Sequence, residues 1–222
     1  MSKHVFDAEG ERFYETGTKN GVLYPWDKTI PGYGKGVAWN GLTAVTESPE
    51  GAEVTTLWAD DIPYLNLLSA ETFKATIEAY MYPDEFGECD GSVSITPGVK
   101  IGQQKRKKFG FCYKTILGND TEGNDLGCKY HLIYGCLAAP SERSYATVND
   151  NPDVMTFSWA VSTTPVKVPG FKPTSCATIE SSKLTSEQIT KLENYLYGTD
   201  NTDPKLPLPD QIPGILAGTV NP

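Results

Sequence analysis

The chain has 222 residues, a length that fits one large β domain or two small domains. Its 28 acidic and 19 basic residues give a net charge of −9, which disfavours binding to nucleic acid or acidic lipid along the whole chain. Its five cysteines are an odd number in a chain too long to need disulfide staples, so we expect a reducing compartment.

The amino terminus lacks the basic-then-apolar layout of a signal peptide, and no apolar run approaches the ~18 residues of a membrane span, so we expect a soluble product. Residues 1–35 carry aromatic residues among turn formers without a sustained period, which predicts an irregular N-terminal arm. Two β-rich runs, Val37–Glu47 and Glu53–Ala59, flank Ser48–Gly51, a turn with proline at its second position. This pattern predicts a hairpin.

Strand-like periodicity returns after residues 60–70, which break the pattern. Phe73–Tyr82 alternates apolar and polar side chains, which predicts a strand with one covered face. Residues 84–108 form a connection longer than a compact domain usually tolerates without a function. Phe109–Leu117 and Tyr130–Leu137 then flank a turn-rich segment and predict a long hairpin that is apolar on both faces. These two apolar faces are covered either by other parts of the same chain, as in a β-sandwich, or by other subunits.

The last third predicts two more strands and one helix. Met155–Ser162 alternates, and Ser175–Glu180 is a further strand. Thr185 and Gln188 have capping-box spacing before an apolar stripe, and Gly198 follows, which predicts a helix at about 185–197. The fold class predicted is therefore mainly β: an antiparallel β-sandwich or barrel-like domain over residues 36–198, with one flanking helix and long arms and loops.

Residues 199–222 form a proline-rich C-terminal arm. Its prolines forbid regular structure, yet it carries Leu206, Leu208 and Ile212. A tail this apolar is better explained by docking on another surface than by a frayed terminus.

No constellation of residues points to catalysis, a metal or a cofactor. Cys128, His131 and Cys136 have a superficial zinc spacing, but in an extended strand His131 points away from both cysteines. The acidic turn at 120–125 lacks the glycine and glutamate of a calcium loop, and the glycines at 32–36 precede no helix that could bind phosphate. A hydrolase built on scattered carboxylates, such as the Asp60–Asp61 or Glu85–Glu88 pairs, remains only a third-ranked alternative.

One basic run interrupts the acidic chain, formed by Lys105, Arg106, Lys107 and Lys108. Three interpretations stay open: a solvated loop, a nucleic-acid contact, or a contact with an acidic patch on a neighbouring subunit. The acidic background favours the subunit contact.

Several segments resemble the tail tube proteins (major tail proteins) of long-tailed bacteriophages that infect Gram-positive bacteria. They are Gly36–Thr43 (GVAWNGLT), Ser48–Glu53 (SPEGAE), Ile77–Phe86 (IEAYMYPDEF), Arg106–Phe111 (RKKFGF), His131–Gly135 (HLIYG), Ser141–Thr147 (SERSYAT), Phe157–Trp159 (FSW) and Thr164–Val166 (TPV). The resemblance implies a structural virion protein rather than an enzyme, with no cofactor. Six copies would close into a ring, and rings would stack into the tube through which genomic DNA leaves the capsid.

The resemblance also implies partners and a location. The chain would bind itself and other tail proteins, namely the tape measure, the tail terminator and the distal tail protein, with no membrane partner. It would lie in the virion tail after assembly in the host cytoplasm. The amino-terminal arm, the connection at 84–108 and the C-terminal arm would stack the rings, with Lys105–Lys108, Leu206, Leu208 and Ile212 as candidate inter-subunit contacts.

An acidic channel would let DNA slide without the counterion release that binds it to a basic wall, because duplex DNA carries one charge per ~1.7 Å. We therefore expect lumen-facing carboxylates. The candidates are Glu47, Glu53, Asp60, Asp61 and Glu78. The strongest rival is a monomeric β-sandwich module for adhesion or carbohydrate binding, in which exposed Trp26 and Trp39 would stack on sugars.

Overall fold

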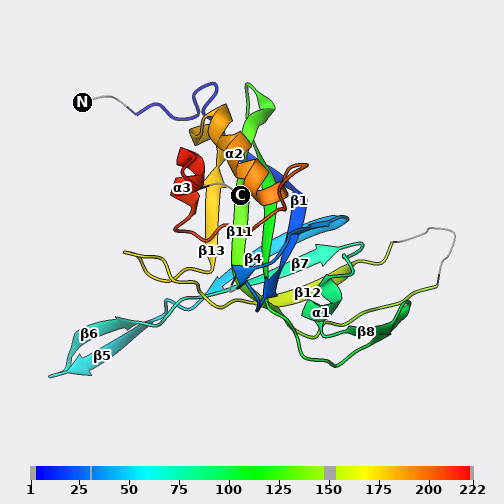
Figure 1. The fold of residues 1–222 in the computed structure, drawn as a ribbon. Helices are drawn as coiled ribbons and strands as arrows, with labels where there is room; N and C mark the ends of the chain where they lie inside the picture. Colours follow the sequence, from blue (N-terminus) through cyan, green and yellow to red (C-terminus); the bar gives the residue numbers. More distant parts are fainter. Residues whose placement is uncertain (1–3, 31, 148–153, 221–222) are drawn as a thin grey trace.

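The computed structural model describes residues 4–30, 32–147 and 154–220, and within them the fold is mainly antiparallel β, as predicted. The strands form a β-sandwich or barrel-like body with a flanking helix (Figure 1). The predicted long hairpin is confirmed as β10 (Phe109–Asn119) and β11 (Gly123–Ala138). It stands at the centre of the largest sheet, whose main path is β2-β1-β10-β11-β12-β7-β4.

The prediction of an irregular arm over residues 1–35 is wrong for Tyr14–Asp27 and Gly32–Tyr33, which are strands. β1 (Tyr14–Asp27) pairs antiparallel with β10, and β2 (Gly32–Tyr33) and β3 (Val37–Trp39) pair with β1. The register of β1 against β10 shifts twice between Thr16 and Val22. Each shift moves the following side chains to the opposite face, so the strand shows no regular alternation in sequence.

The predicted hairpin at 37–59 is also wrong. β4 (Leu42–Glu50) continues through Pro49 and pairs with β7 (Thr72–Ala79), which in turn pairs with β12 (Phe157–Ser162). Because β4 lies at the end of the sheet path, the missing N–H of Pro49 breaks no ladder on its open side. The residue interpreted as a turn signal is a proline tolerated on an edge strand.

Two further hairpins project from this body (Figure 1). β5 (Val54–Ala59), which lies in the predicted β-rich run Glu53–Ala59, pairs with β6 (Ile62–Leu68), which lies in the stretch 60–70 that broke the strand pattern. β8 (Val93–Thr96) pairs with β9 (Val99–Ile101) inside the connection at 84–108, which also holds the short helix α1 (Phe86–Asp90). Each pair forms a two-stranded sheet of its own.

The predicted helix is confirmed as α2 (Ser186–Tyr197). Thr185 accepts a hydrogen bond from the Gln188 backbone, and the Gln188 side chain accepts one from the Thr185 backbone. This capping box satisfies two N–H groups that have no partner inside the helix. β13 (Cys176–Glu180) precedes the helix and pairs with β11.

The C-terminal arm folds back on its own subunit. It ends in α3 (Ile212–Ala217), which packs against α2. The Lys205 N–H donates to the Tyr195 carbonyl at 2.9 Å, and the Tyr134 hydroxyl donates to the Pro207 carbonyl at 3.0 Å. The docking predicted for this tail therefore takes place on the chain itself.

Two hydrophobic cores lie on opposite faces of the β10–β11 hairpin. One contains Phe111, Ile77 and Trp159 and is closed by β4, β7, β12 and α1. The other contains Cys112 and Leu132 and is closed by α2, α3 and the returning tail. The question left open by the sequence is thereby answered, because both apolar faces of the hairpin are covered within one subunit.

A bulge at Gly135 lets β11 serve both layers. β11 pairs with β13 over Lys129–Ile133 and with β12 at Leu137–Ala138, and Gly135 lies between with φ +60°. A Cβ at Gly135 would lie 2.2 Å from the Thr164 carbonyl oxygen, so only glycine fits. Because of the extra residue, the Cys136 side chain points into the core that contains Phe111. Under strict alternation it would share the face of Leu132, which belongs to the other core.

Candidate functional site

The outer face of the β4–β7–β12 layer is polar and rich in hydroxyl groups. The registers place Thr46 and Thr76 opposite each other, Ser158 opposite Glu78, and Ser162 opposite Lys74. The alternate residue Ile77 points to the core. Of the lumen candidates, only Glu78 lies within this face. We call this surface the hydroxyl face.

Glu47 lies on the other side of the same layer. It pairs with the buried Ala75, and its Oε1 accepts a hydrogen bond from the Tyr113 hydroxyl at 2.8 Å. His131 Nδ1 is 3.5 Å from the same oxygen, and the His131 ring stacks on Tyr113 at 4.5 Å. His131 and the Tyr113 hydrogen bond lower the pKa of Glu47, against the opposing effect of burial. Glu47 and Glu78 therefore lie on opposite faces of this layer. One channel wall cannot display both side chains, which corrects the expectation that they face the lumen together.

His131 bridges Glu47 to a second carboxylate. Its Nε2 is 3.3 Å from Glu15 Oε1, and Lys129 Nζ is 2.5 Å from Glu15 Oε2. Burial alone would raise the pKa of Glu15, but the hydrogen bonds from Lys129 and Thr115 lower it overall. The cluster ties β1, β4, β10 and β11 together through hydrogen bonds and the Lys129–Glu15 ion pair.

Two of the cysteines close to the superficial zinc spacing, Cys112 and Cys136, are fully buried. Burial raises the pKa of the Cys112 and Cys136 thiols, so both stay neutral at ordinary pH. Within residues 4–30, 32–147 and 154–220, no three His, Cys, Asp or Glu side chains are placed to hold a metal ion.

The remaining lumen candidates lie outside the β4–β7–β12 layer. Glu53 is exposed just before β5, where its N–H donates to Ser69 Oγ at 3.0 Å. Asp60 and Asp61 form the two-residue turn at the tip of the β5–β6 hairpin, with φ of +49° and +61°. Both carboxylates are exposed.

The β5–β6 hairpin exposes apolar side chains on both faces. Trp58 is 67% exposed and Tyr64 is 71% exposed, although β-strands usually cover residues of this size. The other exposed apolar residues of the hairpin are Val54, Leu57, Ile62, Leu65, Leu67 and Leu68. The β8–β9 hairpin adds Val93, Ile95, Val99 and Ile101. These two hairpins hold apolar strand surface that the subunit leaves uncovered.

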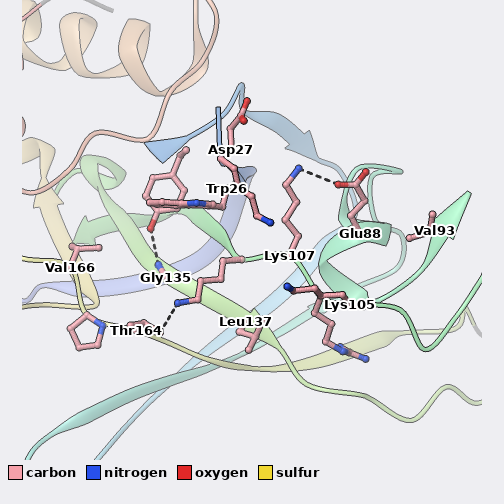
Figure 2. Close-up of a pocket in the computed structure, with 15 residues that line it drawn as sticks. Trp26, Asp27, Glu88, Val93, Lys105, Lys107, Gly135, Leu137, Thr164 and Val166 are labelled. Carbon is pink, nitrogen blue, oxygen red and sulfur yellow. Dashed lines mark hydrogen bonds and ion pairs between the residues drawn. The ribbon is translucent and has the colours of Figure 1, made fainter. Parts of the chain in front are cut away.

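The basic run lines a cavity of about 960 Å³ between the end of β1, the bulge of β11 and residues 164–166 (Figure 2). We call it the basic groove. Its apolar wall includes Trp26, Tyr33 and Leu137, and Trp26 meets Tyr33 edge-on at 5.3 Å. The Tyr33 hydroxyl accepts a hydrogen bond from the Gly135 N–H at 2.8 Å, and burial raises the Tyr33 pKa to about 12. The aromatic wall is thus fixed by the same bulge that joins the two layers.

Five cations and two carboxylates surround the basic groove. The cations are Lys28, Lys105, Arg106, Lys107 and Lys108, and the carboxylates are Asp27 and Glu88. Lys107 pairs with Glu88 at 3.1 Å, and Arg106 pairs with Asp90 at 3.6 Å and donates to the Ala138 carbonyl. Among the described residues, Lys108 Nζ contacts one polar group, Thr164 Oγ1, at 3.3 Å. In the described part of the chain, Lys28 and Lys105 have no ion-pair partner.

Two of the three apolar tail candidates, Leu206 and Ile212, pack within the chain. Leu206 is 5% exposed and packs in the core beneath α2, so its assignment as an inter-subunit contact is corrected. Leu208 and Ile212 are half-buried, and Ile212 packs against the same core.

Trp39 is 2% exposed in the first core, where it packs against Trp159 at 5.5 Å. It cannot stack on a sugar, so Trp39 is removed from the carbohydrate-binding alternative, which named Trp26 and Trp39. Trp26 is half-buried in the basic groove and keeps one accessible side.

No protein-family model and no curated protein matches this chain. Among solved structures, a chain of the anti-feeding prophage baseplate, from its six-fold symmetrised cryo-EM structure, aligns with 83% of this chain and 100% of its own length. The TM-score is 0.39 and the identity is 12%. Among the described residues, no helix has the length and apolar character needed to cross a bilayer.

Proposed function

We propose that this chain is a non-enzymatic structural subunit of a phage tail tube. Six copies would close into a ring, rings would stack, and genomic DNA would pass through the bore. The proposal rests first on the two projecting hairpins. Their strands expose apolar side chains and unpaired backbone edges that a solitary soluble domain normally covers or charges.

The rest of the subunit fits a building block. Both cores are closed, so the hydrophobic interior of the body is complete before assembly. Two strand edges are open to a neighbour. One is the outer edge of β4, and the other is the part of β12 before Val161, where β12 does not pair with β11. The resemblance of the sequence segments to tail tube proteins points the same way.

The channel wall in this proposal is the hydroxyl face. It carries Glu50, Lys74 and Glu78 among threonines and serines, and Lys74 is paired with Glu50 at 2.6 Å. The wall is therefore close to neutral, with a small acidic excess. Such a surface offers duplex DNA no row of cations, so no counterion release would hold the DNA in place.

The proposal also assigns partners and location. The ends of the tube would contact the tape measure, tail terminator and distal tail proteins, and the chain would be found in the virion tail after assembly in the host cytoplasm. No membrane partner is proposed.

Size-exclusion chromatography of the chain with light scattering, followed by negative-stain microscopy, tests the function. Rings or tubes that grow with protein concentration are expected. A chain that stays monomeric at all concentrations and salts contradicts the proposal and favours a binding module, whose half-buried Trp26 would then be its contact residue.

A further inference from the structure

We propose that the tip of the β5–β6 hairpin of one copy docks in the basic groove of a second copy. This contact rests on the proposed self-assembly and gives it a specific pair of surfaces. It is heterologous, because the tip and the groove are different parts of the chain, and heterologous contacts generate rings or filaments.

The turn at the tip is built at a conformational cost. Asp60 and Asp61 both have positive φ, the geometry of a type I′ turn, for which Asn-Gly is the favoured sequence. Two aspartates there give up turn stability and place two carboxylates at the most distant point of the hairpin. An unfavourable residue at a strained position points to a function for its side chain.

The apolar flanks of the tip match the walls of the groove. Trp58 and Ile62 adjoin the turn and are 67% and 58% exposed. The groove offers Trp26, Leu137 and Val166 as apolar surface (Figure 2). Its volume of about 960 Å³ is at the upper end of small-molecule clefts, which leaves room for the end of a peptide hairpin.

The charges of the two surfaces are complementary and mostly free. Within the described residues, Asp60 and Asp61 have no ion-pair partner, and neither do Lys28 and Lys105. Lys108 is held only by a neutral hydroxyl. Asp27 and Glu88 also border the groove, but Glu88 is paired with Lys107, so the rim stays cationic. Opposite charges across an interface fix the orientation and register of the partners.

Three other exposed carboxylates fit less well, because each already has a partner within the chain. Asp84 is paired with Lys100, Asp203 with Lys35, and Asp120 accepts hydrogen bonds from the Gly10 and Arg12 backbones. A duplex nucleic acid would meet five cations at the groove, but the remaining chain is strongly acidic. A second copy of this chain is therefore the favoured occupant.

Charge reversal on each surface tests the pairing in the full-length chain. D60K/D61K and K105E/K108E are each expected to weaken self-association at least tenfold, measured by light scattering over a concentration series. An equimolar mixture of the two variants should regain assembly, because each lysine tip then meets a glutamate groove and each aspartate tip a lysine groove. The four substitutions combined in one chain should regain it as well.

Two control variants separate loss of docking from loss of folding and from a change in net charge. D60N/D61G keeps the turn geometry and removes the charge, so it should lose assembly with an unchanged or higher melting temperature. E122K/D125K makes the same charge change as D60K/D61K, but at and just after the turn of the β10–β11 hairpin, and should assemble like the wild type. Loss of assembly in this control would assign the effect to net charge and overturn the proposed contact.

The remaining outcomes are distinct from failure of the function itself. If the wild type never self-associates, the proposed function fails. If the wild type assembles and both charge-reversal variants assemble equally well, or if the mixture and the combined variant stay dissociated, the tip and groove do not pair. If K105E/K108E instead loses affinity for a 20-base-pair DNA duplex while still assembling, the groove is a nucleic-acid contact and the inference is overturned.

Discussion

The β10–β11 and β5–β6 hairpins are both antiparallel pairs with apolar side chains on both faces, yet only the first is covered. β10–β11 lies between two cores, closed by strands on one side and by helices and the tail on the other. β5–β6 projects with both faces exposed. The comparison teaches that two apolar faces do not by themselves identify an assembly surface. Only the tertiary arrangement decides whether the chain supplies the cover or leaves it to a partner.

The sharpest way to break this comparison is to truncate one tryptophan in the core that covers β10–β11 and one in the β5–β6 hairpin. Trp159 is 1% exposed and packs against Trp39 and Phe86, so Trp159→Ala should lower the free energy of unfolding by about 3–5 kcal/mol. Trp58→Ala, in the exposed hairpin, should change it by less than about 0.5 kcal/mol but weaken assembly. Urea denaturation of the dissociated chain measures both. Similar losses for the two variants would show that the hairpin is covered within the subunit.

Leu206→Ala tests whether the tail belongs to the body or to the assembly surface. Because the side chain is buried beneath α2, we expect a loss of about 2–5 kcal/mol in unfolding free energy. Leu208→Ala, at a half-buried position two residues away, is the matched control and should cost less. Unchanged stability of Leu206→Ala together with lost assembly would instead support an inter-subunit arm.

Thr185→Ala probes how firmly α2 covers the second core. Removing the hydroxyl that accepts from the Gln188 N–H should cost about 1 kcal/mol in thermal or urea unfolding. Thr185→Ser keeps the acceptor and should restore most of the loss. A neutral Thr185→Ala variant would mean that packing alone holds the helix.

Acid titration sharpens the comparison by showing which carboxylates belong to the body. The folded-state pKa of Glu47 is lowered, so its stabilisation is complete above the unfolded-chain value of about 4.3 and is lost as pH falls through the lowered value. Glu47→Gln should therefore reduce stability at pH 7, by no more than about 1 kcal/mol given its partial exposure, and flatten the decline in melting temperature below pH 4.5. Glu53→Gln, in the exposed segment before β5, is the control. An unaltered acid profile in Glu47→Gln would contradict the link to His131.

Local patterns predicted the elements whose signals lie within a few residues. The capping box, the alternation of Phe73–Ala79 and the paired runs around 118–127 correspond to α2, β7 and the β10–β11 hairpin. Predictions failed where a distant partner sets the meaning of a residue. Pro49 marks an edge strand rather than a turn, and two register shifts hide the strand from Tyr14 to Asp27.

The candidate site divides in the same way. The basic run was visible in sequence, but its aromatic wall was not, because Trp26 and Tyr33 lie about 80 residues away along the chain and reach the groove only through sheet pairing. The positive φ of Asp60 and Asp61 could not be read from an Asp-Asp pair, which has no strong turn preference of its own.

By itself the sequence determined the mainly β class, the central hairpin and the capped helix, because hydrophobic period and capping are local properties of the chain. The tertiary structure alone decided which apolar surface stays free and which acidic side chains share a face. Which apolar surfaces are covered, and which face a side chain occupies, depend on strand pairing between residues far apart in sequence. A register shift of one residue moves every following side chain to the other face of the sheet.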